Sequence, residues 1–235
     1  AWSLRWYRQM VGISSIGDTT VVTDKWMLGT RNSFIVGISA TFLATALGTV
    51  AALGLSRPHM PFKGTIMAIL ISPMIVPLII TAAGMFFFYS KVGLTHSYLG
   101  LILAHTALGT PFVVITVTAT LTGFDTNLIR ASQSLGADTM RTFFKVIMPL
   151  ILPGVISGAL FAFITSFDEV VVVMFVGSVE QITIPKQMWA GLRQETSPVI
   201  LCMATCLVFL SIALLTTVEL LRRRSERLRG IKLRN

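Results

Sequence analysis

Two adjacent carboxylates, Asp168 and Glu169, stand inside an otherwise apolar stretch, Leu150–Val176. A carboxylate costs about 2.5–3.5 kcal/mol to place at the centre of a membrane helix, so such acids are candidates for function. Gly158, Phe161 and Thr165 precede Asp168 at spacings of three or four residues, so the four residues form one small, aromatic and polar stripe along a helix. A carboxylate beside aromatic faces suits an ammonium group. We therefore predict a pathway for a cationic solute along this stripe, with Glu169 turned about 100° away on the same helix.

An alternative interpretation of the two acids needs no ligand. A carboxylate at the end of a helix can accept hydrogen bonds from backbone amides or pair with a basic residue of the next loop, such as Lys186.

The sequence lacks the residue sets that catalysis or metal binding would need. His59, His96 and His105 are far apart, and we expect His105 to pack inside a span. Cys202 and Cys206 lie four residues apart in an apolar run without further ligands, which favours packing over a metal site. No G-x-x-x-x-G-K-[ST] pattern occurs, so we predict neither ATP hydrolysis nor any other catalysis by this chain.

Residues 122–150 form a polar stretch between two apolar runs and hold two short amphipathic helix patterns. The apolar positions of the first pattern are Leu128, Ala131 and Leu135, and those of the second are Met140, Phe143, Phe144 and Ile147. Asp125 and Asp138 stand where N-caps belong, and Gly136 stands where a C-terminal cap would end the first helix. The pattern predicts a helix–elbow–helix that offers a surface to a partner in water.

The composition places these features in a membrane protein. Hydrophobic residues make up 54% of the 235 residues, charged residues only 12%, and the mean hydropathy is +0.79. A soluble domain carries about twice this charged fraction. The net charge of +9 then indicates membrane topology rather than nucleic-acid binding.

Five stretches are long enough to cross a bilayer, which takes about 20 apolar residues. They are Phe34–Leu55, Ile66–Phe88, Leu99–Leu121, Leu150–Val176 and Pro198–Leu221. Prolines and glycines within them, such as Pro73, Pro77 and Gly158, predict kinks or close helix packing.

The distribution of Lys and Arg gives the direction of these spans. Loops 56–65 and 122–149 and the tail 222–235 carry 12 basic residues, whereas the other side carries 7. The positive-inside rule places the twelve in the cytoplasm. We therefore expect residues 1–32 outside, residues 33–221 as the membrane domain, and residues 222–235 as a basic cytoplasmic tail near anionic lipid. Because five spans would leave the first residue outside without a signal sequence, we also expect a sixth span upstream of residue 1.

Residues 130–149 resemble the cytoplasmic coupling loop of ABC importer membrane subunits, whose motif reads E-A-A, three residues, G, nine residues, I-x-L-P. The matching positions are Ala131, Gly136, Ala137, Phe143, Phe144 and Pro149. The departures are Arg130 for Glu, Ser132 for the second Ala, Val146 for Ile and Met148 for Leu. The Arg130 exchange reverses a charge.

Further segments look like the branch of this family that serves spermidine and putrescine. They are Ser3–Tyr7, Arg31–Ser33, Thr110–Val114, Ser166–Val172, Ile184–Pro185 and Trp189. The resemblance implies an all-α, polytopic helical bundle of the type I ABC importer permease kind. It also implies a multi-pass subunit of the bacterial cytoplasmic (inner) membrane.

The resemblance further implies which residues and partners carry the function. Residues of the coupling loop that would contact the ATPase or hold the loop to the bundle are Arg130, Ala131, Ser132, Leu135, Gly136, Ala137, Phe143, Phe144 and Pro149. The expected partners are a second, non-identical permease, two ATPase subunits that bind ATP and Mg, and an external binding protein. The expected cargo is a polyamine, with opines, aminophosphonates or amino-acid-like solutes as alternatives. A secondary transporter working without ATP is a further alternative.

Overall fold

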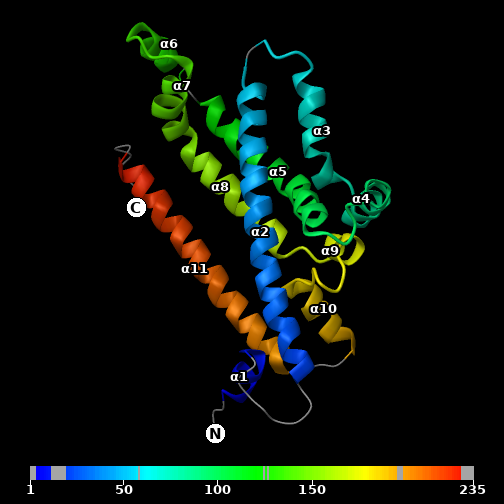
Figure 1. The fold of residues 1–235 in the computed structure, drawn as a ribbon. Helices are drawn as coiled ribbons and strands as arrows, with labels where there is room; N and C mark the ends of the chain where they lie inside the picture. Colours follow the sequence, from blue (N-terminus) through cyan, green and yellow to red (C-terminus); the bar gives the residue numbers. More distant parts are fainter. Residues whose placement is uncertain are drawn as a thin grey trace. The chain divides into compact units, whose positions relative to one another are not determined.

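The structure of this protein is a computed structural model (Figure 1). It describes residues 4–11, 20–57, 59–123, 125, 127–194 and 198–228. Within these residues there are helices and connections but no strand, which confirms the predicted all-α class. Two parts of the sequence interpretation, Ser3 and residues 229–235 of the basic tail, lie outside the described residues.

In chain order the helices are α1 (Arg5–Val11), α2 (Thr20–Leu55), α3 (Lys63–Ile75), α4 (Leu78–Val92), α5 (Tyr98–Thr122), α6 (Asn127–Ser134), α7 (Thr139–Thr142), the π-helical turn η1 (Phe143–Ile147), α8 (Met148–Phe167), α9 (Val171–Val176), α10 (Ile184–Gln194) and α11 (Pro198–Leu228).

In the described chain, four helices are long and apolar enough to cross a membrane. A fifth crossing results if α3 and α4 together form one span. The helix that contains the first predicted span begins earlier than the sequence predicts, since α2 starts at Thr20 rather than at Phe34. The expected boundary between residues 1–32 and the membrane domain therefore falls inside a continuous helix.

The predicted second span is interrupted in its middle. Helix α3 ends at Ile75, and Val76 is extended, with φ −71° and ψ 134°. Pro77 explains the break, because a proline disfavours the helical conformation of the residue before it. The kink expected from the prolines of this stretch is thus confirmed as a complete break.

The predicted fourth span, Leu150–Val176, is wrong at its C-terminal end. Helix α8 stops at Phe167, and the short helix α9 restarts only at Val171. Asp168 and Glu169 lie in the interval, so these acids are not inside a continuous membrane helix as the sequence interpretation assumed. The sequence alone did not indicate this break, because the residues that follow the two acids, Val170–Val176, are all apolar and extend the pattern of a span.

The described chain divides into two compact units. The first comprises the described residues within 1–37, 82–102 and 167–235, and the second comprises those within 38–81 and 103–166. The core of the first unit consists of Trp26, Ile184, Val199, Ile200 and Met203, with Trp6 and Met10 of α1 packed against it.

The second unit packs α2, α5 and α8 through small side chains. Its core consists of Ala44, Ala52, Val113, Val117, Ile151, Val155 and Ala162. A Cβ at Gly158 would lie 2.8 Å from the Cα of Val113, so α8 and α5 approach as closely as a glycine allows. Close approach of this kind is how membrane helices gain packing energy.

Candidate functional site

The polar stretch that the sequence singled out folds as the predicted helix–elbow–helix. The amide of Gly136 donates to the carbonyl of Gln133 over 2.9 Å, and the amide of Ala137 donates to the carbonyl of Ser132 over 3.1 Å. This pair of bonds is the Schellman arrangement, which needs a left-handed residue after the helix. Gly136 supplies it with a φ of +82°. The predicted cap is confirmed.

The second helix of the elbow begins at the predicted acid. Asp138 accepts a hydrogen bond from the Arg141 amide over 2.7 Å, as an N-cap side chain does. Asp125 acts similarly before α6, where its carboxylate accepts the Asn127 amide over 2.9 Å. Local backbone capping therefore shapes both halves of the elbow.

A side-chain hydrogen bond connects the two halves. The hydroxyls of Ser132 on α6 and Thr142 on α7 lie 2.9 Å apart and share a hydrogen bond. Thr142 is buried, whereas Ser132 is half-buried. Ser132 stands where the family motif has its second alanine, so this bridge belongs to a departure from the motif.

The apolar stripe of α6 faces away from the rest of the unit. Leu128 is 43% exposed, and Ala131 one turn later is exposed as well. Leu135, which follows the last residue of α6 directly and continues the stripe, is 89% exposed. The opposite face of α6 presents Ile129 and Gln133 to a cavity of this unit. Two leucines left in water cost free energy unless another surface covers them.

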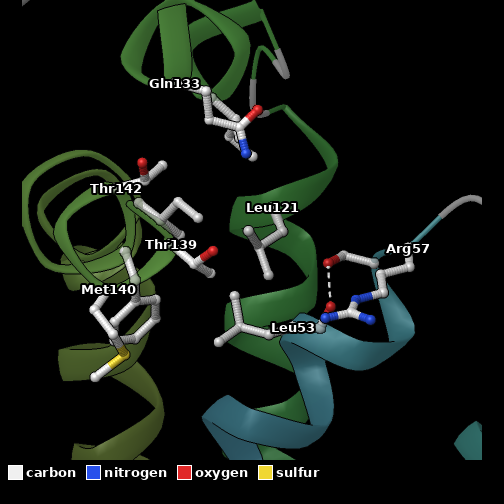
Figure 2. Close-up of a pocket in the computed structure, with 11 residues that line it drawn as sticks. Leu53, Arg57, Leu121, Gln133, Thr139, Met140 and Thr142 are labelled. Carbon is white, nitrogen blue, oxygen red and sulfur yellow. Dashed lines mark hydrogen bonds between the residues drawn. The ribbon is translucent and has the colours of Figure 1, made fainter. Parts of the chain in front are cut away.

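Behind the elbow lies a cavity of about 460 Å³ (Figure 2). Leu53 and Leu121, near the ends of α2 and α5, form one side, and Thr139 and Met140 of α7 form the other. Phe143 is half-buried and also lines the cavity, as expected of an anchor.

The neighbouring Phe144 differs from this expectation. It is 59% exposed and packs edge-on against the Phe143 ring, with 5.0 Å between the ring centroids. In the described chain its ring is therefore not inserted into the bundle. The two phenylalanines are not equivalent anchors.

A π-helical turn joins the elbow to α8. The Met148 amide donates to the carbonyl of Phe143, five residues earlier. Pro149 follows directly and has no amide hydrogen to continue the ordinary ladder. Pro149 therefore lies at the transition from the π-helical turn to the α-helix α8, and its side chain is exposed.

The two acids of the predicted cargo pathway have different surroundings. Glu169 is only 7% exposed, and its Oε1 accepts the Val172 amide over 2.9 Å at the start of α9. This matches the alternative interpretation, a helix-end acid bonded to backbone. Asp168 is exposed, and none of the hydrogen bonds of the described chain involves its carboxylate. Of the two, only Asp168 offers a free carboxylate.

Lys186, the basic residue suggested as a partner for the acids, is used elsewhere. Its ammonium donates to the carbonyls of Val173 and Ser178 over 3.2 and 3.3 Å. Burial lowers the pKa of this ammonium below its usual value.

The remaining predicted pathway residues belong to the second unit. Phe161 is 52% exposed, and its ring stacks on Phe112 with 6.1 Å between centroids. Thr165 is half-buried one turn further along α8. Gly158 is buried against α5, so the predicted stripe does not present one uniform face.

Two buried polar contacts were not found from the sequence. The first lies within the second unit, where His105 Nδ1 is 2.7 Å from the Ser166 hydroxyl. His105 is 1% exposed, so its predicted packing inside the span is confirmed. A histidine and a serine 61 positions apart give no local signal of this bond.

The second is a polar contact of the first unit that we call the Asn32 clasp, made of Asn32, Ser33 and Tyr98 with the main chain of 180–184. The side-chain amide Nδ2 of Asn32 donates to the main-chain carbonyls of Glu180 and Ile182 over 2.7 and 2.8 Å. The Tyr98 hydroxyl donates to Oδ1 of the Asn32 side chain over 2.8 Å, and the Ser33 hydroxyl accepts from the Ile184 amide over 2.9 Å. The family resemblance pointed to Arg31–Ser33 and Ile184–Pro185 separately, and the clasp joins these two segments.

These features define a helical protein with several membrane-length apolar helices and an exposed elbow. The family of binding-protein-dependent transport system inner membrane components matches residues 44–228. The chain belongs to this family and is a permease subunit of an ABC importer, a multi-pass protein of the inner membrane. Such subunits work with a binding protein, a further permease and ATP-binding subunits.

Among similar curated proteins, the spermidine/putrescine transport system permease protein PotC of Haemophilus influenzae is 29% identical over 96% of this chain and 84% of its own length. PotC of Escherichia coli K12 is 28% identical over 85% of this chain and 76% of its own. The putrescine transport system permease protein PotI of Escherichia coli K12 is 28% identical, over 88% and 73%.

One solved structure supports the fold. A chain of the MetNI methionine ABC transporter, in inward-facing conformations, matches with a TM-score of 0.60 and 23% identity. The match covers 87% of this chain and 95% of the other. It establishes the type I permease fold.

Proposed function

We propose that this chain is the permease subunit of an ATP-driven importer and that its elbow is where a separate ATPase grips it. The observation that carries the proposal is the exposed stripe of Leu128, Ala131 and Leu135 on α6. A short helix with an uncovered apolar stripe suits a groove on a partner protein. ATP and Mg are bound and used by that partner.

The elbow has the mechanical properties that this role requires. Its backbone caps and the Ser132–Thr142 bridge hold α6 and α7 as one piece. Its second half continues through η1 into α8 without an intervening loop. A displacement imposed on α6 by closing ATPases is thereby passed directly to a membrane-spanning helix.

We place the elbow and the C-terminal tail in the cytoplasm, in agreement with the excess of basic residues on that side. The transport cycle is alternating access. ATP-driven closure opens the membrane part outward towards a binding protein, and hydrolysis returns it. The cargo passes between this subunit and a second, non-identical permease.

Removing the apolar character of the stripe tests the coupling proposal. Leu135→Asp places a charge at the more exposed of the two leucines, directly after the last residue of α6, and we expect the ATPase subunit to be lost when the permeases are purified. Val179→Asp is the matched control, because Val179 is 77% exposed in a connection of the other unit. Equal recovery of the ATPase with both variants would contradict the proposal.

The proposed cargo is a small polycation of the spermidine or putrescine kind. The curated relatives named above support this class, and the free carboxylate of Asp168 supplies the charge that an ammonium group needs. Glu169 contributes by holding the start of α9 rather than by binding cargo. Phe161 and Thr165 line the route within α8. Opines and aminophosphonates are the alternative cargoes.

Uptake measurements test the cargo proposal independently. We expect Asp168→Asn to reduce uptake of labelled putrescine and spermidine about ten-fold while the complex still assembles, because one charge interaction is lost. Glu180→Gln is the control, since Glu180 is also exposed and its hydrogen bonds use only the main chain. Unchanged polyamine uptake by Asp168→Asn would rule out this role.

A further inference from the structure

The cavity behind the elbow has no role in the docking proposed above. It lies entirely within the second unit, and it is bounded by the ends of α2 and α5 and by the segment from α6 to η1. Its volume of about 460 Å³ falls within the range of small-molecule sites, about 300–1,000 Å³.

The lining of the cavity is largely apolar and carries one cation. The apolar residues are Leu53, Leu121, Ile129, Met140, Phe143 and Ile147. Among the polar residues, the hydroxyls of Ser56 and Thr142 are already hydrogen-bonded within the unit. Arg57 is exposed at the edge, and the bonds of the described chain that involve it use only its main chain. No carboxylate is among the lining residues.

The position of the cavity indicates its occupant. Leu53 and Leu121 belong to the last turns of α2 and α5, both of which are long and apolar enough to cross the membrane. The cavity therefore opens where acyl chains give way to headgroups. Basic pockets between membrane helices are known to receive anionic lipid headgroups. The guanidinium disfavours a cationic cargo at the same place.

We propose that this cavity binds one anionic phospholipid, with an acyl chain among the apolar residues and the phosphate on the Arg57 guanidinium. A guanidinium can bind a phosphate through two parallel hydrogen bonds. Because α6, α7 and η1 form one wall, the lipid ties the elbow to the span ends from the side opposite the exposed stripe. Only this effect on coupling rests on the proposed function, whereas lipid binding itself needs only the membrane placement.

Lipid retention by the complete transporter tests the binding. The complex is purified from membranes, equilibrated with equal amounts of phosphatidylglycerol and phosphatidylcholine, and analysed by native mass spectrometry. We expect phosphatidylglycerol to be retained selectively and Arg57→Gln to retain it about five-fold more weakly. Arg57→Lys, which keeps the charge, should fall between the two.

Lys63→Gln is the matched control, because Lys63 is an exposed cation at the start of α3, close to Arg57 in sequence, and does not line the cavity. Its retention should equal that of the unmodified protein. Equal losses in both glutamine variants, equal retention of the two lipids, or no effect of Arg57→Gln would overturn the proposal.

A photo-reactive side chain at Met140 identifies what fills the cavity. An adduct with the mass of a phospholipid supports the proposal. An adduct with the ATPase or the other permease, or no adduct at all, overturns it. Recovery of the ATPase in the same preparations reports separately on the proposed function, so the two ideas can fail independently.

Discussion

The elbow and the connection between α9 and α10 are both short segments between long helices, but they are held in opposite ways. The α9–α10 connection is fixed by Asn32 and Ser33, which lie about 150 positions earlier in the chain. The elbow is shaped by its own caps at Gly136 and Asp138 and by one hydroxyl bridge. The bonds from Asn32 and Ser33 fix the α9–α10 connection to the rest of its unit. The local caps of the elbow use no distant residue and leave the apolar face of α6 exposed for a partner.

The largest effect on stability should come from breaking the Asn32 clasp. Asn32→Ala leaves the Ile182 carbonyl and the Tyr98 hydroxyl, both of half-buried residues, with fewer partners. An unsatisfied buried polar group costs about 1–3 kcal/mol, so we expect the free energy of unfolding to fall by about 2 kcal/mol. A lower Tm of the purified complex would report this.

Asn127→Ala is the control for that measurement, because Asn127 is exposed and none of the hydrogen bonds of the described chain involves its side chain. If both alanine variants melt at the same temperature, the α9–α10 connection is not held by the clasp, and the contrast with the elbow disappears.

The next effect concerns the left-handed residue of the elbow. Gly136→Val places a β-branched side chain at a φ of +82°, which costs roughly 1–2 kcal/mol and turns α6 away from α7. We expect transport to fall strongly and the Tm to fall by about 2–8 °C. The strain arises from the backbone conformation alone, because a Cβ at this position would meet no atom within 4 Å.

Gly136→Asn separates conformation from side-chain bulk, since asparagine tolerates the left-handed region. Transport by the asparagine variant should stay close to that of the unmodified protein. Equal activities of the valine and asparagine variants would show that the elbow's shape is unimportant.

The smallest effect should come from the hydroxyl bridge. Ser132→Ala removes one neutral hydrogen bond and should lower the free energy of unfolding by about 1 kcal/mol. Ser134→Ala is the control, because the Ser134 hydroxyl bonds only to a carbonyl of its own helix, that of Arg130. A double-mutant cycle with Thr142→Val isolates the pair, and a coupling energy of zero would refute the bridge.

The elbow could be predicted from the sequence because its signals are local. Gly136 and Asp138 are cap residues at the positions where the two apolar patterns break and resume, and each acts on neighbouring amides. The direction of the stripe could not be predicted. Helical spacing shows that Leu128, Ala131 and Leu135 share a face, but only the packing of Ile129 and Gln133 shows which face points outward.

The regions that differed from prediction have one of two causes. Either residues far apart in the sequence are in contact, or an apolar pattern that favours one long helix is interrupted by a residue that starts a new one. The apolar residues on both sides of Asp168 and Glu169 favoured one long span, whereas the Glu169 carboxylate ends that pattern by capping a new helix. The clasp of Asn32 joins residues that no window of the sequence contains together. The start of α2 was not predicted because its first turns contain polar residues, which are not typical of a membrane span. Two of the polar residues before Phe34, Asn32 and Ser33, are buried within the first unit.

The central claim is that the exposed face of α6 is covered by a separate ATPase. The most direct test places a photo-reactive side chain at Leu135 or, as the internal control, at Ile129, and illuminates membranes that contain the whole transporter. The account predicts that Leu135 captures the ATPase subunit and that Ile129 does not. Capture of lipid alone from Leu135, or equal capture from both positions, would contradict it.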